Sequence, residues 1–195
     1  RFFMTTVNDI LHLLLAYAPR HLAWERDNIG LLIGTATAPV RRVLVCLDVT
    51  PETVLEARER DADLIVAHHP LIFHPLRTIR TDDVAGRMLV DLLSAGISVI
   101  AMHTNADAAE QGLNVALAAT LGLEYVRPLE APRDADNRTG LGAVGRLATP
   151  VPHEVFLQHV RTALGCENLR FSRIHAPRSI STVAVCGGSG SGPPA

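Results

Sequence analysis

Two stretches of the sequence decide its fold: Leu64-Ile-Val-Ala-His-His-Pro70 and Ile97-Ser-Val-Ile-Ala-Met-His-Thr-Asn-Ala-Asp107. Each begins as a short apolar run and ends abruptly in polar side chains. Arg42–Leu47 is a third run of the same kind, earlier in the chain. Continuous apolar runs of this length are typical of strands that are covered on both faces. We therefore interpret the three runs as buried strands of one sheet.

Helices are predicted before and between these strands. Val7–Tyr17 carries apolar residues at helical spacing. Thr50-Pro51 supplies an N-cap and a proline at the first helical position, and this helix is expected to run to about Arg60. Thr81-Asp-Asp opens a further helix that ends near Leu93. The alternation predicts right-handed βαβ crossovers and an α/β fold, a mostly parallel sheet with helices on both faces.

The composition of the chain changes after Leu129. Residues 130–139 form a polar, linker-like run, and Gly140–Leu147 begins a new strand-like element. A helix to about Leu164 is expected next, with strand candidates at Asn168–Ile174 and Thr182–Cys186. We predict a first α/β lobe over residues 4–129 and the start of a second lobe over residues 130–195. Because a buried strand running into glycines normally continues into another element, we expect the second lobe to be truncated.

The bulk composition excludes several classes of protein. The 195 residues are 48% hydrophobic, which is ample for a buried core. The chain has 18 Lys and Arg residues and 20 Asp and Glu residues, and no stretch concentrates the basic ones. A nucleic-acid partner is therefore not favoured. The apolar runs are far shorter than the roughly 18 residues of a membrane span. Cys46, Cys166 and Cys186 lie far apart, so we expect reduced thiols in a cytoplasmic protein.

Polar residues follow the end of each predicted strand. Asp48 follows the first, the pair His68 and His69 the second, and His103 with Asp107 the third. Open α/β sheets bind their ligands at these carboxyl ends. Successive side chains of an extended segment point to opposite sides. We therefore expect His68 and His69 to bind two neighbouring ions, one each, and Asp107 to bridge the two ions. Imidazole and carboxylate together suit Zn, Fe, Mn, Co or Ni.

The predicted chemistry is metal-assisted hydrolysis. Two divalent ions about 3.5 to 4 Å apart would polarise a substrate oxygen and lower the pKa of a bridging water. His103 is open between a metal ligand, a residue that orients a ligand, and a substrate contact. Asp48 either orients a ligand or caps the turn before Thr50. The alternative for His68-His69 is a chance pair without a metal.

The motifs together resemble the dinuclear-metal proteins known as GTP cyclohydrolase 1 type 2 homologues, also called the NIF-three-like family. The resemblance covers nearly the whole chain, and the order of the two histidine motifs is specific. It implies that His68, His69 and Asp107 bind two metal ions. It also implies two similar α/β lobes per subunit and a homo-oligomer, a toroidal hexamer. The matching stretches are Asp27–Leu31, Leu47-Asp48, Ala67–Leu71, His103–Asp107, Gly142–Arg146 and Cys186-Gly-Gly-Ser-Gly.

In that family a His and a Glu one helical turn apart complete the metal site, beyond the Gly-Ser-Gly segment. The present chain ends first, so the resemblance implies a C-terminally truncated chain that keeps part of the ligand set. The implied function is a metal-dependent hydrolase acting on a nucleotide or another phosphorylated small molecule. The alternative is a non-catalytic metal-binding protein, such as a store or a regulatory scaffold. The sequence does not separate the two, because ligand sets that bind metal and ligand sets that use it look alike.

Overall fold

A computed structural model of the protein describes residues 4–130, 137–172 and 179–188. The chain divides into two compact units, residues 1–106 and residues 107–195. The lobe boundary predicted between residues 129 and 130 falls inside the second unit and stays a prediction. Within the described ranges, no helix is long and apolar enough to cross a membrane.

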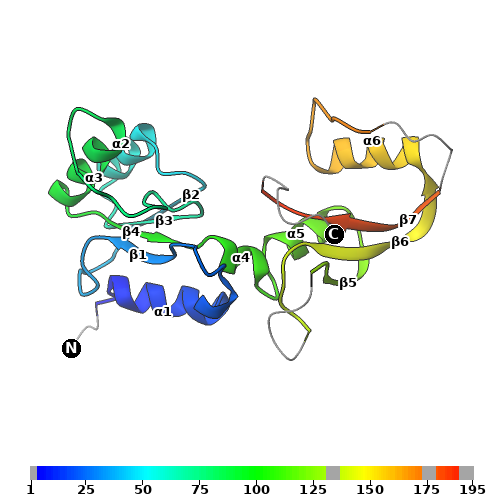
Figure 1. The fold of residues 1–195 in the computed structure, drawn as a ribbon, viewed down its shortest axis with the longest axis horizontal. Coiled ribbons are helices and arrows are strands. Elements are labelled where there is room, and N and C mark those ends of the chain that lie inside the picture. Colours follow the sequence, from blue (N-terminus) through cyan, green and yellow to red (C-terminus); the bar gives the residue numbers. More distant parts are fainter. Residues whose placement is uncertain (1–3, 131–136, 173–178, 189–195) are drawn as a thin grey trace. The chain divides into compact units, whose positions relative to one another are not determined.

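The first unit is built on a four-stranded sheet (Figure 1). Its strand order is β1 (Gly30–Ile33), β4 (Ser98–Ala101), β3 (Leu64–Ala67) and β2 (Val43–Cys46). Strands β2, β3 and β4 are parallel, whereas β1 runs antiparallel to β4. The sheet is therefore mixed. The parallel arrangement predicted for the three apolar runs is correct, and β1 is the antiparallel addition.

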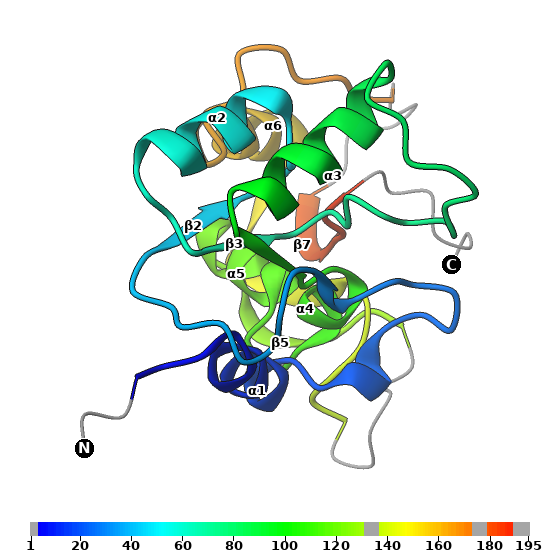
Figure 2. The same ribbon diagram turned by 90° about the vertical axis from the view of Figure 1, so that its left-hand side faces the viewer.

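Helices cover both faces of this sheet (Figure 2). Helices α2 (Pro51–Glu59) and α3 (Val84–Ser94) lie on one face, and α1 (Val7–Tyr17) lies on the other. The first helix of the pair begins where predicted, because the Thr50 side chain accepts a hydrogen bond from the backbone N–H of Thr53. The connections that carry α2 and α3 thus join parallel strands, as the βαβ pattern requires.

The core of the first unit fixes the positions of the strand ends. Ile65 and Val99 project from β3 and β4 into a cluster with Val54 and Leu92, which come from α2 and α3. These side chains are at most 3% exposed. Full burial of an aliphatic side chain of this size contributes roughly 1.5–3 kcal/mol. The central strands are therefore held rigidly where their carboxyl ends leave the sheet.

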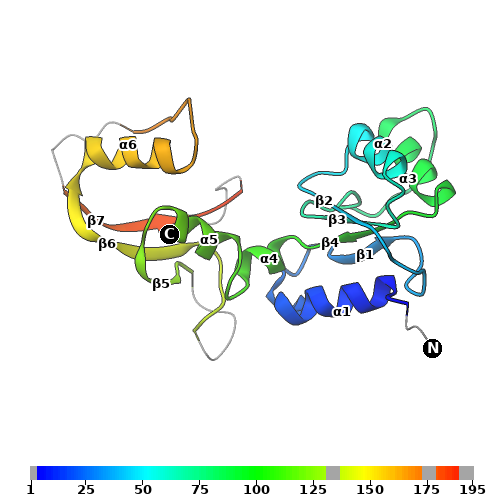
Figure 3. The same ribbon diagram turned by 180° about the vertical axis from the view of Figure 1, so that it is seen from behind.

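The second unit contains a three-stranded sheet of order β5 (Glu124–Pro128), β6 (Ala143–Pro152) and β7 (Ser179–Val185) (Figure 3). Both pairs are antiparallel. Helices α5 (Leu113–Thr120) and α6 (His153–Ala163) contribute side chains to the apolar cluster of this sheet. Two short helices complete the described elements: η1 (Arg20–Leu22) in the first unit and α4 (Thr104–Ala108), which crosses the boundary between the units.

The prediction of a mostly parallel sheet is wrong for the second unit. Buried residues in β7 are confined to Val183 and Val185, with an exposed residue between them. This alternation is typical of an antiparallel sheet with one covered face. The strand candidate Thr182–Cys186 overlaps β7, so the sequence located the strand but not its antiparallel pairing. Residues 168–172 of the strand candidate Asn168–Ile174 are not in a strand, and its last two residues lie outside the described ones. The similarity of two α/β lobes stays a prediction.

Candidate metal centre

Three histidines gather at the carboxyl end of the first sheet. His68 and His69 directly follow β3, and His103 lies two residues beyond the end of β4. Because β3 and β4 are parallel neighbours, the residues that follow them meet at one edge. Candidate ligand atoms of the three imidazoles all lie within 4.8 Å of one another, and all three residues are half-buried. Three nitrogen ligands this close together can hold a divalent transition metal ion.

The two adjacent imidazoles converge instead of pointing to opposite sides. The centroids of the His68 and His69 rings are 4.9 Å apart, and the His103 ring lies 5.2 and 5.6 Å from them. Strand β3 ends at Ala67, and the chain bends at the two histidines. The alternation of an extended strand therefore no longer applies to them. The structure adds His103, which the sequence left open, to the same group of possible ligands.

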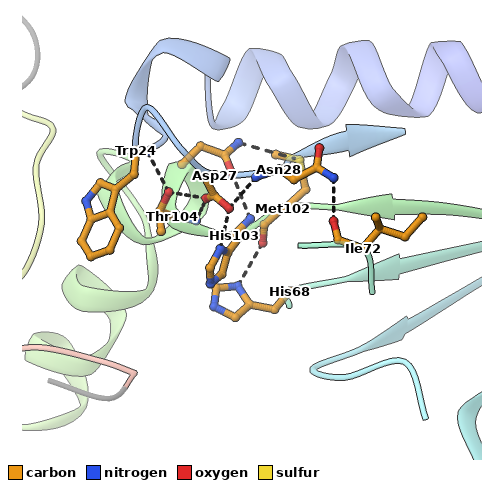
Figure 4. Close-up of polar contacts among 9 residues, drawn as sticks. Trp24, Asp27, Asn28, His68, Ile72, Met102, His103 and Thr104 are labelled. Atoms are coloured by element: carbon orange, nitrogen blue, oxygen red, sulfur yellow. Dashed lines mark hydrogen bonds and ion pairs between the residues drawn. The ribbon is translucent and has the colours of Figure 1, made fainter. Parts of the chain in front are cut away.

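The orientation of His68 is fixed by a backbone oxygen. Its Nδ1 atom lies 2.9 Å from the carbonyl oxygen of Met102, in the residue after β4. A carbonyl oxygen can only accept a hydrogen bond, so the imidazole Nδ1–H must donate. In the neutral ring this tautomer carries its lone pair on Nε2. Figure 4 shows the contact together with the neighbouring His103 ring.

The other two histidines are oriented by carboxylates. Nδ1 of His69 lies 2.7 Å from Oδ1 of Asp48, and Nδ1 of His103 lies 2.8 Å from Oδ1 of Asp27. Metal-binding histidines almost always donate their second ring N–H to a carboxylate or a backbone carbonyl in this way. Asp48 thus contacts His69 through its side chain, while its backbone oxygen accepts a hydrogen bond from the Thr53 hydroxyl. Its role in orienting a metal ligand stays a prediction.

Asp27 is the most buried charged group at the site, with a side chain only 1% exposed. It accepts hydrogen bonds from the backbone N–H of Thr104 at 3.1 Å, from the Thr104 hydroxyl, and from His103. The backbone N–H of Trp24 donates in turn to the same hydroxyl. Burial alone would raise the pKa of Asp27, but the hydrogen bonds from Thr104 and His103 outweigh burial and lower the pKa below its usual value. The carboxylate is thus held as an anion.

The sequence interpretation missed Asp27 as a site residue. The sequence places Asp27 in a turn before a short strand. No apolar run links that turn to the ends of the three predicted strands. Strand β1 is antiparallel to β4, with Gly30 opposite Ala101, so the start of β1 meets the carboxyl ends of the parallel strands. The only local signal was an Asp-Asn pair ahead of a glycine. That signal indicates a turn and says nothing about which strand end it will meet.

The residues after His103 hold it in place. Asn105 is fully buried; its side-chain oxygen accepts a hydrogen bond from the backbone N–H of His103, and its amide nitrogen donates to the carbonyl of Ala18. Thr104 links the same turn to the buried aspartate described above. The His-Thr-Asn motif therefore supplies one candidate ligand and two residues that position it.

Asp107 lies in α4, four residues after His103, and is the first residue of the second unit. It is half-buried, and its backbone oxygen accepts a hydrogen bond from the Asn114 side chain at 3.2 Å. The group of possible ligands found among the described residues consists of the three histidines. The role of Asp107 as a metal ligand stays a prediction.

The chain matches a family model over residues 5–193, that of Duf34/NIF3 (NGG1p interacting factor 3). Several curated relatives carry the name GTP cyclohydrolase 1 type 2 homolog, and two of them illustrate the match. The one from Clostridium perfringens is 33% identical over 94% of this chain and 70% of its own length. The one from Bacillus subtilis is 42% identical over 80% of this chain, but the match spans only 40% of that relative.

Solved structures agree with these matches. The Staphylococcus aureus hypothetical protein SA1388 has a TM-score of 0.88 and 27% identity, covering 97% of this chain and 74% of that one. Reduced HcgD from Methanocaldococcus jannaschii has a TM-score of 0.70 and 31% identity, covering 83% of this chain and 61% of that one. The fold is thus shared with these solved structures. The match to the family model over nearly the whole chain shows that the chain belongs to the Duf34/NIF3 family.

Proposed function

We propose that the cluster of His68, His69 and His103 binds a divalent transition metal ion and that the protein is a metal-dependent hydrolase. The observation that carries the proposal is the shared orientation of the three rings. Each Nδ1 atom faces an oxygen acceptor, so each neutral ring carries its lone pair on Nε2, and the candidate ligand atoms lie within 4.8 Å of one another. Zn, Fe, Mn, Co and Ni all suit such a set.

A second ion is part of the proposal, with Asp107 as a further ligand. A carboxylate can bridge two cations, and two cations at one sheet edge need more negative charge than three neutral imidazoles supply. The buried Asp27 carboxylate and the partly exposed Asp48 carboxylate add two negative charges next to the rings. Both carboxylates would offset the positive charge of bound cations and would also hold the imidazole rings in orientation.

When bound, the ions would supply Lewis-acid activation of water and of a substrate oxygen. The chain's own residues orient the histidine rings and supply the negative charge of the Asp27 and Asp48 carboxylates. We propose a nucleotide or another phosphorylated small molecule as the substrate, because the curated relatives are named as homologues of a GTP cyclohydrolase. We also propose that the complete protein assembles into a toroidal hexamer, as its resemblance to the family implies.

A non-catalytic metal-binding protein is the second candidate, and one observation favours it. Within the described residues, the group of possible ligands contains imidazoles alone. The carboxylates of Asp48 and Asp27 each accept a hydrogen bond from a histidine ring nitrogen. In these positions they orient the rings and do not serve as a general base. A metal store or a regulatory scaffold would need nothing more.

Turnover assays with added metal separate the two candidates. The chain is treated with a chelator, reloaded with Zn²⁺, Mn²⁺ or Fe²⁺, and incubated with GTP or p-nitrophenyl phosphate. A hydrolase is expected to lose turnover with the chelator, regain it with metal, and lack it in His68→Ala and His103→Ala. The control is His12→Ala, which removes an exposed histidine of α1. Stoichiometric metal without turnover on any nucleotide would favour the store or scaffold.

A further inference from the structure

One aromatic side chain of the first unit lies beside the histidine cluster. Phe73 belongs to the loop that follows His68 and His69. The centroid of its ring lies 6.3 Å from that of His103, and the two ring planes are at 90°. The Phe73 ring also meets the His74 ring, at 4.9 Å and 79°. Aromatic pairs favour such edge-to-face contacts, and these two hold the phenyl ring in one orientation next to a candidate metal ligand.

The turn formed by Asp27 and Asn28 fixes both partners of the contact between Phe73 and His103. The Asp27 carboxylate accepts a hydrogen bond from Nδ1 of His103. The Asn28 side-chain amide donates to the carbonyl oxygen of Ile72 at 2.6 Å, directly before Phe73 (Figure 4). The Ile72 side chain packs against the apolar core of the first unit. Adjacent residues of one turn therefore place a candidate ligand and the aromatic ring side by side.

Phe73 is held in place and is still open to a ligand. Leu71 and Ile72 are half-buried and pack against the core, whereas Phe73 is 43% exposed. A single exposed apolar residue is ordinary on a protein surface. This one differs because its ring adjoins a candidate metal ligand and a side-chain hydrogen bond ties down the backbone before it. A planar group stacked on the exposed part of the ring would bury it without a movement of the loop, so the ring is preorganised for such a group.

We propose that Phe73 stacks on the aromatic base of a nucleotide-like ligand whose phosphate lies at the histidine cluster. The inference rests on the proposed metal-dependent function and narrows its substrate class, from phosphorylated small molecules in general to those that carry a planar base. A nucleoside phosphate is longer than the 6.3 Å between the Phe73 and His103 rings, so one molecule can reach both. Stacking on an aromatic face tolerates every base. Phe73 therefore selects for the presence of a base and does not choose between bases.

Binding of ligands with and without a base tests the inference. The Zn²⁺-loaded full chain is titrated by calorimetry with GMP, with AMP and with ribose 5-phosphate. The parent chain is expected to bind both nucleotides more tightly than ribose 5-phosphate. Phe73→Ala should weaken nucleotide binding roughly tenfold or more, the usual order for loss of a base–aromatic stack, and should leave the affinity for ribose 5-phosphate unchanged. Phe73→Tyr keeps an aromatic face and should retain the preference for nucleotides.

A second apolar residue of the same loop provides the control. Leu76 is 46% exposed, and Leu76→Ala should bind all three ligands as the parent chain does. Equal affinity of the parent chain for GMP and ribose 5-phosphate, no binding of any of the three, or a nucleotide preference that survives Phe73→Ala would overturn the inference alone. Zn²⁺ content is measured first, because a parent chain that takes up no Zn²⁺ would overturn the proposed function and this inference with it. If Phe73→Ala does not retain Zn²⁺, the comparison of ligands on the parent chain and on Phe73→Tyr decides.

Discussion

Replacing the buried carboxylate by an amide, Asp27→Asn, is expected to destabilise the first unit strongly. In the wild type Oδ1 of Asp27 accepts hydrogen bonds from His103 and from the Asn28 N–H, and Oδ2 accepts from the Thr104 N–H and the Thr104 hydroxyl. An amide of the same shape keeps only one acceptor oxygen. Its NH₂ group would face N–H donors and could not accept their hydrogen bonds. About two charge-assisted hydrogen bonds are lost, at roughly 1.5–3 kcal/mol each. We therefore expect a loss of roughly 3 kcal/mol or more in the free energy of unfolding.

Urea unfolding followed by tryptophan fluorescence measures this loss. Trp24 is the single tryptophan of the chain and lies in the first unit, so its emission reports on that unit. A chelator is present throughout, so that metal binding does not add to stability. The control is Asp61→Asn, whose carboxylate is 82% exposed and whose loss should cost less than about 1 kcal/mol. Equal midpoints for Asp27→Asn and the control would refute the argument that this buried network holds the site.

Three further changes test other parts of the account. In Asp48→Asn the affinity for Zn²⁺, measured by competition with a chromophoric chelator, should fall roughly 10–100-fold; unchanged affinity would remove its orienting role. Two backbone N–H groups lower the pKa of Asp63 although burial opposes them, so Asp63→Asn should cost about 1 kcal/mol at neutral pH. That difference should shrink as pH falls below about 4; pH-independence contradicts it. Gly34→Ala should unfold at clearly lower urea than wild type, because a Cβ would lie 2.8 Å from Cα of Ser98 at a φ of +97°.

Sequence patterns predicted correctly the helices and strands that are specified by residues close together in the chain. Val7–Tyr17 and Leu64–Ala67 have the predicted bounds, since helical spacing and a continuous apolar run each specify one element. Thr50 and Pro51 likewise marked the real start of α2. The parallel order of three strands followed from the helices between them.

The features that were missed depend on pairings between distant segments. Asp27 reaches His103 only because β1 is antiparallel to β4, which nothing near residue 27 indicates. Strand β5 is mostly exposed and has Tyr125 at a φ of +53°, so it lacks the apolar run of a buried strand. The convergence of His68 with His69 follows from a bend directly after β3, at a position where the sequence pattern assumed an extended chain.

Titration of the chelator-treated chain with Co²⁺, read by visible absorption and by elemental analysis, tests the metal centre most directly. The account predicts at least one bound equivalent and an absorption spectrum of nitrogen-coordinated cobalt. Both should be lost in a chain that combines His68→Ala, His69→Ala and His103→Ala, and retained in His12→Ala. Equal binding by the triple variant and the wild type, with circular dichroism showing that both are folded, would contradict the assignment of the metal centre to these three histidines.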